Sequence, residues 1–190
     1  LFENMILPII AYGDPVLKKV GSSIDKDYKG LGQLIENMFE TMYAASGVGL
    51  AAPQVGISIR LFVVDTKPFA EDEPELENFK KVFINPQIIE EVGDEWKFNE
   101  GCLSIPGIRE DVLRKKIVHL RYQDEEFKTH ETVFEGLAAR VIQHEYDHVD
   151  GKLFVEKLSP FKKQLIKGKL RDITIGKVDV DYKMRFPIKK

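Results

Sequence analysis

The sequence predicts an α+β fold in which mixed or antiparallel sheets pack around a central helix. Two observations lead to this class. Apolar residues recur at helical spacing in two stretches, and capping signals mark a further helix, whereas β-branched and aromatic residues concentrate in four other segments. The 190 residues contain no internal repeat and no dividing linker, and 43% of them are hydrophobic. We therefore expect a single domain over residues 1–190, long enough to bury a substantial core.

The first helix is expected over roughly residues 29–45. Its apolar residues recur three and four positions apart, as on one face of a helix: Leu34, Ile35, Met38, Phe39, Met42 and Tyr43. Gly47 supplies a stop signal at the C-terminal end. The helix would therefore lead directly into the glycine-rich segment 47–54.

Segments rich in β-branched and aromatic residues are predicted to be strands, and they are 59–65, 82–92, 117–122 and 178–186. The last of them also alternates, with apolar side chains at Val178, Val180, Tyr182 and Met184. Residues 67–80, between the first two strands, are acidic and contain proline. This segment should be a solvated loop.

Two more helices are indicated by capping signals. Residues 132–135, Thr-Val-Phe-Glu, resemble a capping box, and Gly151 would end the helix that follows them. The inward face of this second helix should carry Leu137, Val141, His144 and His148. Ser159 and Pro160 would cap and open a third helix over roughly 160–171.

The second helix carries an H-E-x-x-H pattern, which runs from His144 to His148. Residues four apart lie on one face of a helix, so both histidines can offer a ring nitrogen to one metal ion. The carboxylate of Glu145 lies beside the pair, where it can accept a proton from metal-bound water instead of coordinating the metal. The pattern indicates a hydrolytic site, and the sheets would pack around this central metal-binding helix.

The alternative interpretation is a surface helix with two solvated histidines, and a metal site needs a further ligand. The long metalloprotease pattern would place a third histidine where this chain has Phe154, which cannot ligate. Candidates elsewhere are a carboxylate, His119, His130 and the only cysteine, Cys102. A lone cysteine is more often an inert apolar residue than a ligand. Cys102, however, lies among glycine and proline residues that should hold the backbone out of regular structure.

Three segments together resemble the signature of the peptide deformylases, the metal-dependent amidases that remove the formyl group from the N-terminal methionine of nascent bacterial or organellar proteins. The segments are Gly-Val-Gly-Leu-Ala-Ala-Pro-Gln at 47–54, Glu-Gly-Cys-Leu-Ser at 100–104 and His-Glu-Tyr-Asp-His at 144–148. They occur in the family's order, and the similarity runs from about Met5 to the region 158–160. The family often has leucine after the second histidine, whereas this chain has Val149.

The resemblance implies a ligand set and a mechanism. The ligands of one divalent ion would be Cys102, His144 and His148, with a fourth position left for water. The ion would be Fe²⁺, and Zn²⁺, Ni²⁺ or Co²⁺ could occupy the same ligands. Metal-bound water would attack the formyl carbon, with Glu145 as general base and then general acid. The side-chain amide of Gln54 and the backbone N–H of Leu103 would stabilise the oxyanion.

The resemblance also implies a groove for an extended formyl-methionyl peptide. The apolar pocket for the methionine side chain would be formed by Val48, Phe98, Leu137 and Val141. The remaining substrate contacts would come from Gly49 and Val48 as main-chain partners, from Gly101, and from Arg109 near the peptide backbone. Arg114 and Asp147 could pair and brace the metal-binding helix.

Composition excludes several classes of function. The net charge of −3 gives no basic footprint for nucleic acid, and no apolar run approaches the roughly 18 residues of a membrane span. One cysteine allows no intrachain disulfide, which fits a reducing cytoplasm. The N-terminus has no signal-peptide pattern; we expect Met5 to be the natural start and residues 1–4 to come from a vector or an upstream start. Residues 173–190 are expected to add one strand.

The sequence thus predicts a cytoplasmic, monomeric deformylase that acts on N-formylmethionyl nascent peptides at the ribosome exit. Two other classes stay open. A general metallopeptidase is supported by H-E-x-x-H itself, but Phe154 and a cysteine ligand count against it. A catalytically silent relative that acts as a binding module is disfavoured by the presence of Glu145 and Gln54.

Overall fold

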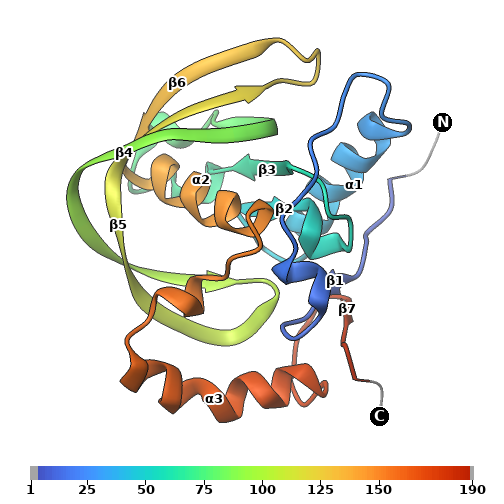
Figure 1. Ribbon diagram of the computed structural model, residues 1–190, viewed down its shortest axis with the longest axis vertical. Coiled ribbons are helices and arrows are strands. Elements are labelled where there is room, and N and C mark those ends of the chain that lie inside the picture. The colour runs from blue at the N-terminus through green and yellow to red at the C-terminus, as the bar shows by residue number, and fades with distance from the viewer. Residues whose placement is uncertain (1–3, 189–190) are drawn as a thin grey trace.

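The computed structural model describes residues 4–188 and confirms the α+β class. Figure 1 shows helix α2 (Gly136–Val149) at the centre, with strands β4 (Lys80–Cys102) and β5 (Ile105–Gln123) curving around it. Helices α1 (Leu31–Ala44) and α3 (Pro160–Thr174) lie toward the outside of the molecule. Within residues 4–188, none of the helices has the length and apolar character needed to cross a membrane.

The main sheet has five strands in the order β2-β3-β4-β5-β6, and every neighbouring pair is antiparallel. Its shorter members are β2 (Gly49–Ala51), β3 (Leu61–Asp65) and β6 (Thr129–Glu135). The register between β4 and β5 shifts at several points along their length. Such bulges bend a strand and increase its twist, which lets this long hairpin wrap around α2.

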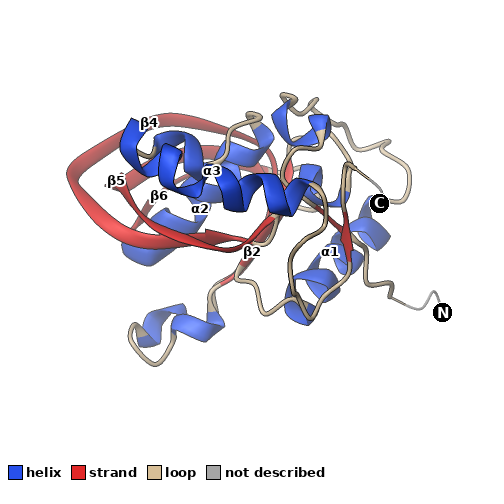
Figure 2. Cartoon of the chain, turned by 90° about the horizontal axis from the view of Figure 1, so that it is seen from below, coloured by secondary structure: helices blue, strands red, loops and turns tan. Residues whose placement is uncertain are grey.

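A second, two-stranded sheet joins the two ends of the chain. Strand β1 (Ile9–Ile10) pairs in parallel with β7 (Met184–Arg185). Figure 1 shows this pair to the side of α2, beyond β2, and Figure 2, seen from below, shows β4 and β5 curving on the side of the molecule opposite α1. The segments around residues 9–10 and 184–185 therefore lie side by side.

Helix α2 is buried along almost its whole length, since only Gly136 and Tyr146 are partly exposed. Its apolar residues Val141, Ile142 and Val149 pack in one cluster with Phe62 and Phe83 of the sheet. The polar residues are buried as well, and they include Arg140, Gln143, His144, Glu145, Asp147 and His148. Buried polar side chains need hydrogen-bond or ion-pair partners, and such a concentration of them on one helix indicates that the functional site is located at α2.

All three expected helices are present, but the stop signal of the first was wrong. Helix α1 ends at Ala44, and the left-handed residue after its C-cap is Ser46 (φ 55°) instead of Gly47. The N–H of Gly47 closes the helix end on the carbonyl of Met42 at 2.9 Å. For α3 the signal was right: Ser159 Oγ accepts from the N–H of Lys162, although the helix runs on to Thr174.

The capping box before α2 was also wrong. Residues 132–135 are the last part of strand β6, where Thr132 pairs with Leu120 of β5. The N-cap Glu135 makes no side-chain capping bond, and Gly136 (φ 60°) turns the chain directly from strand to helix. Ladder pairing with β5 therefore uses the backbone that a capping box would need. The C-terminal signal was right, since Gly151 (φ 70°) follows the C-cap Asp150.

The strand predictions located β3, the first half of β4 and the last part of β5, but they missed β1, β2 and β6. At the C-terminus only Met184–Arg185 is a strand, so the strand predicted over 178–186 was too long. Residues 177–183 still alternate between exposed and half-buried, as the pattern indicates, but they form no ladder. The loop 67–80 contains two 3-10 helices, Lys67–Phe69 and Pro74–Leu76, and Leu76 is buried instead of solvated.

Candidate metal and catalytic site

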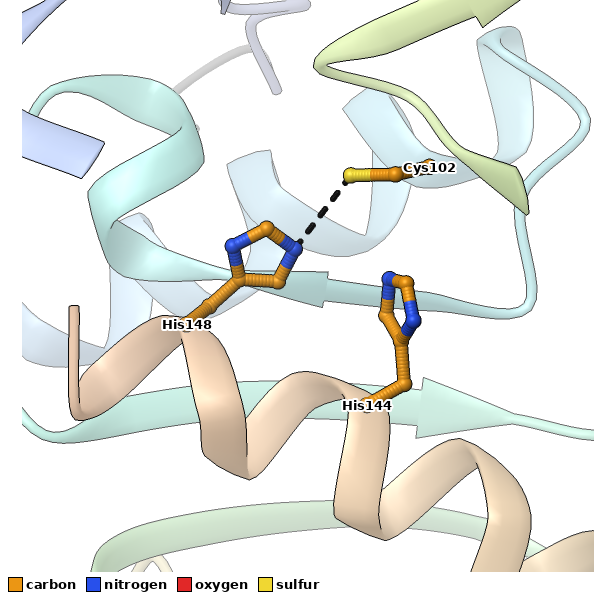
Figure 3. A group of neighbouring side chains, drawn as sticks. All are labelled: Cys102, His144 and His148. Atoms are coloured by element: carbon orange, nitrogen blue, oxygen red, sulfur yellow. Dashed lines mark hydrogen bonds between the residues drawn. The ribbon is translucent and has the colours of Figure 1, made fainter. Parts of the chain in front are cut away.

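His144, His148 and Cys102 converge on one point beside α2. The two histidines lie one turn apart on the helix, and Cys102 is the last residue of β4. One ligand atom from each of the three lies within 4.8 Å of the other two. Figure 3 shows the imidazole of His148 facing the sulfur, and its Nε2 is 3.3 Å from Cys102 Sγ. The structure therefore brings together the three residues that the sequence indicated as ligands.

Cys102 is held in a tight hairpin. It pairs with Ile105 across a turn made of Leu103 and Ser104, so the irregular backbone predicted at Cys102 is confined to these two residues. His119 and His130, the other candidates, lie on β5 and β6, where their partners are Glu131 and Asp124. Neither of these histidines belongs to the ligand group.

Glu100 orients His144 from the side opposite the ligand group. Its Oε1 lies 2.9 Å from His144 Nδ1, which leaves the Nε2 atom of this ring for the site. Burial alone would raise the pKa of Glu100, but hydrogen bonds from His144 and Arg114 outweigh it and hold this pKa well below its usual range. Glu100 is therefore an anion that fixes the ring. Burial also lowers the pKa of His148 well below its ordinary value, which favours the neutral, ligating form.

Two buried arginines surround Glu100. Arg114 donates to Glu100 Oε2 at 2.8 Å and to Asp147 Oδ2 at 2.8 Å, so the contact with Asp147 that the resemblance suggested is present. Arg140 donates to Glu100 Oε2 at 2.8 Å, and it also bonds the backbone carbonyls of Val112 at 3.0 Å and Trp96 at 2.7 Å. The two guanidinium groups thus tie helix α2 to β4 and β5 behind the ligands.

Arg140 was missed in the sequence, although its position carried a signal. In the sequence it interrupts an otherwise apolar run, residues 137–142. A cation in a buried run of this kind needs a buried partner, but the sequence does not reveal that this partner is Glu100, forty residues away.

Glu145 lies beside the ligand group with a free oxygen. The residue is buried, and its Oε2 has no hydrogen-bond partner among the described residues. Burial raises the pKa of Glu145 to about 7, a value suited to proton exchange near neutral pH. Gly49 of β2 lies directly opposite, since a Cβ atom there would be 2.5 Å from Glu145 Oε1. The absence of a side chain at Gly49 therefore leaves the space that this carboxylate occupies.

Gln54 reaches the same point from the 3-10 helix Ala52–Val55 that follows β2. Its Oε1 accepts from the N–H of Ala51 at 2.9 Å, which fixes the amide. Its Nε2 donates to Ser104 Oγ at 3.2 Å and lies 3.5 Å from Cys102 Sγ. The donor of Gln54 is therefore directed at the hairpin turn and the ligand group.

A cavity of about 800 Å³ opens above these residues, and its wall includes Cys102, His144 and Glu145. The expected substrate residues in its lining are Val48, Gly49, Phe98, Gly101, Arg109 and Val141, together with the expected oxyanion donors Gln54 and Leu103. Leu137 is not in the lining; it packs behind the wall with Leu76 and Ala138, next to Phe98. Arg109 is held at the rim by Asn99, through Oδ1 at 2.9 Å and the backbone carbonyl at 2.6 Å.

A histidine pair and a cysteine, with a free buried carboxylate beside them at the base of a large cavity, define a metal-dependent hydrolase. The family model described as polypeptide deformylase matches residues 6–164. The chain therefore belongs to the polypeptide deformylase family, the enzymes that hydrolyse the formyl group from N-formylmethionyl peptides.

Individual relatives agree. The chain is 60% identical to a peptide deformylase of Christiangramia forsetii, over 96% of this chain and 97% of the relative. It is 56% identical to that of Flavobacterium johnsoniae, over 98% of both chains. The solved structure of the Thermus thermophilus peptide deformylase is 41% identical, with a TM-score of 0.79 over 89% of this chain and 98% of that one. The similarity covers nearly the whole length of each protein.

Proposed function

We propose that deformylation takes place at the base of the cavity, with Cys102, His144 and His148 as ligands of one divalent ion and Glu145 as the group that moves the proton. The observation that carries this proposal is the position of Glu145. Its free Oε2 is buried next to two histidines whose ring nitrogens face a thiol. A carboxylate without a partner at such a place can take up and return a proton.

The three ligands suit a catalytic metal. One sulfur and two imidazole nitrogens make a three-coordinate protein site, and such sites leave a position open for water. When bound, a divalent ion supplies Lewis acidity and lowers the pKa of a water molecule in that position. We propose Fe²⁺ as the natural ion, with Ni²⁺, Co²⁺ or Zn²⁺ as substitutes in the same ligands.

Glu145 and two hydrogen-bond donors would carry out the remaining steps. Glu145 accepts a proton from the attacking water and then delivers it to the leaving amine. The Gln54 amide and the Leu103 N–H donate to the oxygen of the formyl group as negative charge develops on it. Each fixed donor of this kind contributes roughly 3 to 4 kcal/mol to the transition state.

The peptide would lie extended along the cavity. We propose that Val48, Phe98 and Val141 contact the methionine side chain, and that Leu137 supports Phe98 from behind. Gly49 and Gly101 would contact the peptide backbone through their main chains, while the space in which their Cβ atoms would lie is occupied by Glu145 and Arg109. Arg109 at the rim would contact the substrate backbone beyond the methionine.

The setting of the reaction is part of the proposal. We infer that the natural substrates are nascent chains at the ribosome exit and that the enzyme works as a monomer in the cytoplasm. We also propose that residues 1–190 act as one domain. This is supported by the pairing of β1 with β7, which joins both ends of the chain beside the site.

One assay separates this function from its two rivals. Metal-loaded protein is incubated with formyl-Met-Ala-Ser and, separately, with an unformylated peptide of similar length. Formate from the first substrate with no cleavage of the second is expected. Cleavage of internal peptide bonds would instead identify a general metallopeptidase, and binding of the formyl peptide without turnover would identify a silent relative.

A further inference from the structure

The C-terminal segment forms one wall of the cavity, although no step described above uses it. Residues 179–182 line the cavity together with Cys102 and Leu103. After α3 ends at Thr174, the chain turns back toward the site, and β7 joins β1. The match to the family model ends at residue 164, so this wall lies outside the part of the chain that defines the family.

Tyr182 makes the direct contact with the hairpin turn that carries Cys102. Its hydroxyl donates a hydrogen bond to the backbone carbonyl of Leu103 at 2.8 Å. Burial, reinforced by the nearby charges of Cys102 and Asp181, raises the pKa of Tyr182 to about 12. The hydroxyl therefore keeps its proton at neutral pH and is a permanent donor to this carbonyl.

The same turn is held from two other directions. The backbone N–H of Tyr12 donates to the carbonyl of Ser104 at 2.8 Å. Gln54 Nε2 donates to the hydroxyl of Ser104 at 3.2 Å. The carbonyls of both turn residues, Leu103 and Ser104, are thus bonded to segments that are distant in the sequence. Each carbonyl lies in one planar peptide group with the N–H of the next residue, so these bonds fix the peptide groups 103–104 and 104–105. The Leu103 N–H belongs to the preceding peptide group, 102–103, which is joined to the fixed part of the turn at the Cα atom of Leu103.

We propose that Tyr182 is a positioning residue of the active site. By holding the Leu103 carbonyl it restricts the backbone rotation at Leu103, so that the Leu103 N–H, on the preceding peptide group, stays directed at the oxygen of the substrate's formyl group. The inference rests on the proposed role of Leu103 as an oxyanion donor. Such a donor is effective because it is oriented before the reaction begins. A turn that can rotate must be reoriented during each turnover, and that cost appears in kcat.

The test compares Tyr182→Phe with Tyr43→Phe in the full-length, nickel-loaded enzyme. Tyr43→Phe is a matched control, because it also removes one hydrogen bond donated by a phenol hydroxyl, in this case to Asp65 Oδ2 at 2.6 Å. Tyr43 does not line the cavity. With formyl-Met-Ala-Ser, we expect kcat of Tyr182→Phe to fall about tenfold at unchanged KM and metal content, and Tyr43→Phe to keep normal kcat.

Hydrogen–deuterium exchange gives a readout that does not depend on turnover. Amides of residues 102–105 should exchange faster in Tyr182→Phe than in wild type, and Tyr43→Phe should leave them unchanged. A normal kcat in Tyr182→Phe, or a loss of kcat that parallels loss of metal, would overturn the positioning role. Wild-type enzyme that releases no formate would instead refute the proposed function, so the two failures are distinguishable.

Discussion

Gly49 and Glu145 face each other across the packed surfaces of β2 and α2, so closely that a Cβ atom at position 49 would lie 2.5 Å from Glu145 Oε1. Real Cβ atoms essentially never approach another heavy atom this closely. The absence of a side chain at Gly49 therefore leaves room for the carboxylate of Glu145, which we propose as the general base.

Replacing Gly49 by alanine should displace this carboxylate. We expect Gly49→Ala to fold and to bind metal, but to lose about a hundredfold in kcat, because a shift near 1 Å misplaces the general base. Gly32→Ala is the matched control, since a Cβ atom at Gly32 would have no neighbour within 4 Å. Steady-state kinetics of both variants make the check, and equal activities would show that Glu145 has room to move.

Substitutions of Glu145 and of Cys102 should have different effects on metal content and on kcat. Glu145→Ala is expected to keep a full equivalent of metal and to lose about 100- to 10,000-fold in kcat, because only proton transfer is removed. Cys102→Ala should lose metal first, because it removes a ligand. Metal analysis beside kinetics separates the two. A metal-free Glu145→Ala protein would make Glu145 a ligand and reject the mechanism.

The proposed pocket should favour substrates with an apolar first side chain, because it buries that side chain. Burying a methionine side chain contributes roughly 1.5 to 3 kcal/mol, so kcat/KM for formyl-Met peptides should exceed that for formyl-Gly peptides by about ten- to a hundredfold or somewhat more. Val141→Trp should fill the space and reduce kcat/KM for the methionine substrate selectively. Equal rates for the two wild-type substrates would remove the pocket assignment.

The identity of the metal should govern the lifetime of the enzyme. If Fe²⁺ is the bound ion, as we propose, it would lie beside the thiolate of Cys102, where oxygen can oxidise the metal and then the sulfur. We expect the iron form to lose activity in air, the nickel form to be active and much longer lived, and the zinc form to be slower. Activity is followed over time with and without oxygen. An iron form stable in air for days, or a zinc form faster than both others, would contradict the assignment of iron.

Arg140 should matter for stability, because it is buried and bonds Glu100 and two backbone carbonyls. Arg140→Leu removes one donor from each of these buried acceptors, although Glu100 keeps its bonds to Arg114 and His144, and it should destabilise the fold by about 3 kcal/mol. Arg121→Leu provides the comparison, since Arg121 forms a half-exposed pair with Glu131 and should cost no more than about 1 kcal/mol. Denaturant unfolding of both variants measures the difference.

The sequence predicted the site better than the strands around it. His144, Glu145 and His148 could be placed because helical spacing fixes their relative positions, whatever the rest of the fold. The capping box at 132–135 could not be distinguished from the end of a strand, because the competing partner is β5, a distant segment. Long-range pairing of this kind leaves no local signal in the sequence.

The buried ion-pair network around Glu100 could not be predicted from the sequence, because it too depends on contacts between distant segments. Arg140 and Glu100 are individually ordinary charged residues, and only the curvature of β4 and β5 brings them together. Leu137 is a different case: its periodicity correctly predicts burial, but not that it packs with Leu76 and Ala138 outside the cavity lining. Helical periodicity indicates which face is inward, and the neighbouring elements decide what lies there.

The hairpin turn at Leu103 is tied to Tyr12 near the start of the chain and to Tyr182 near its end. Chain ends are usually the first parts of a protein to fray, and fraying there is normally harmless to function. Here, loosening of either segment would remove a hydrogen bond from the turn next to Cys102, the residue that we propose as a metal ligand. Because Tyr182 follows Leu103 by 79 residues, a newly made copy of this enzyme can complete the support of this turn only after the segment behind α3 has been synthesised and has folded back.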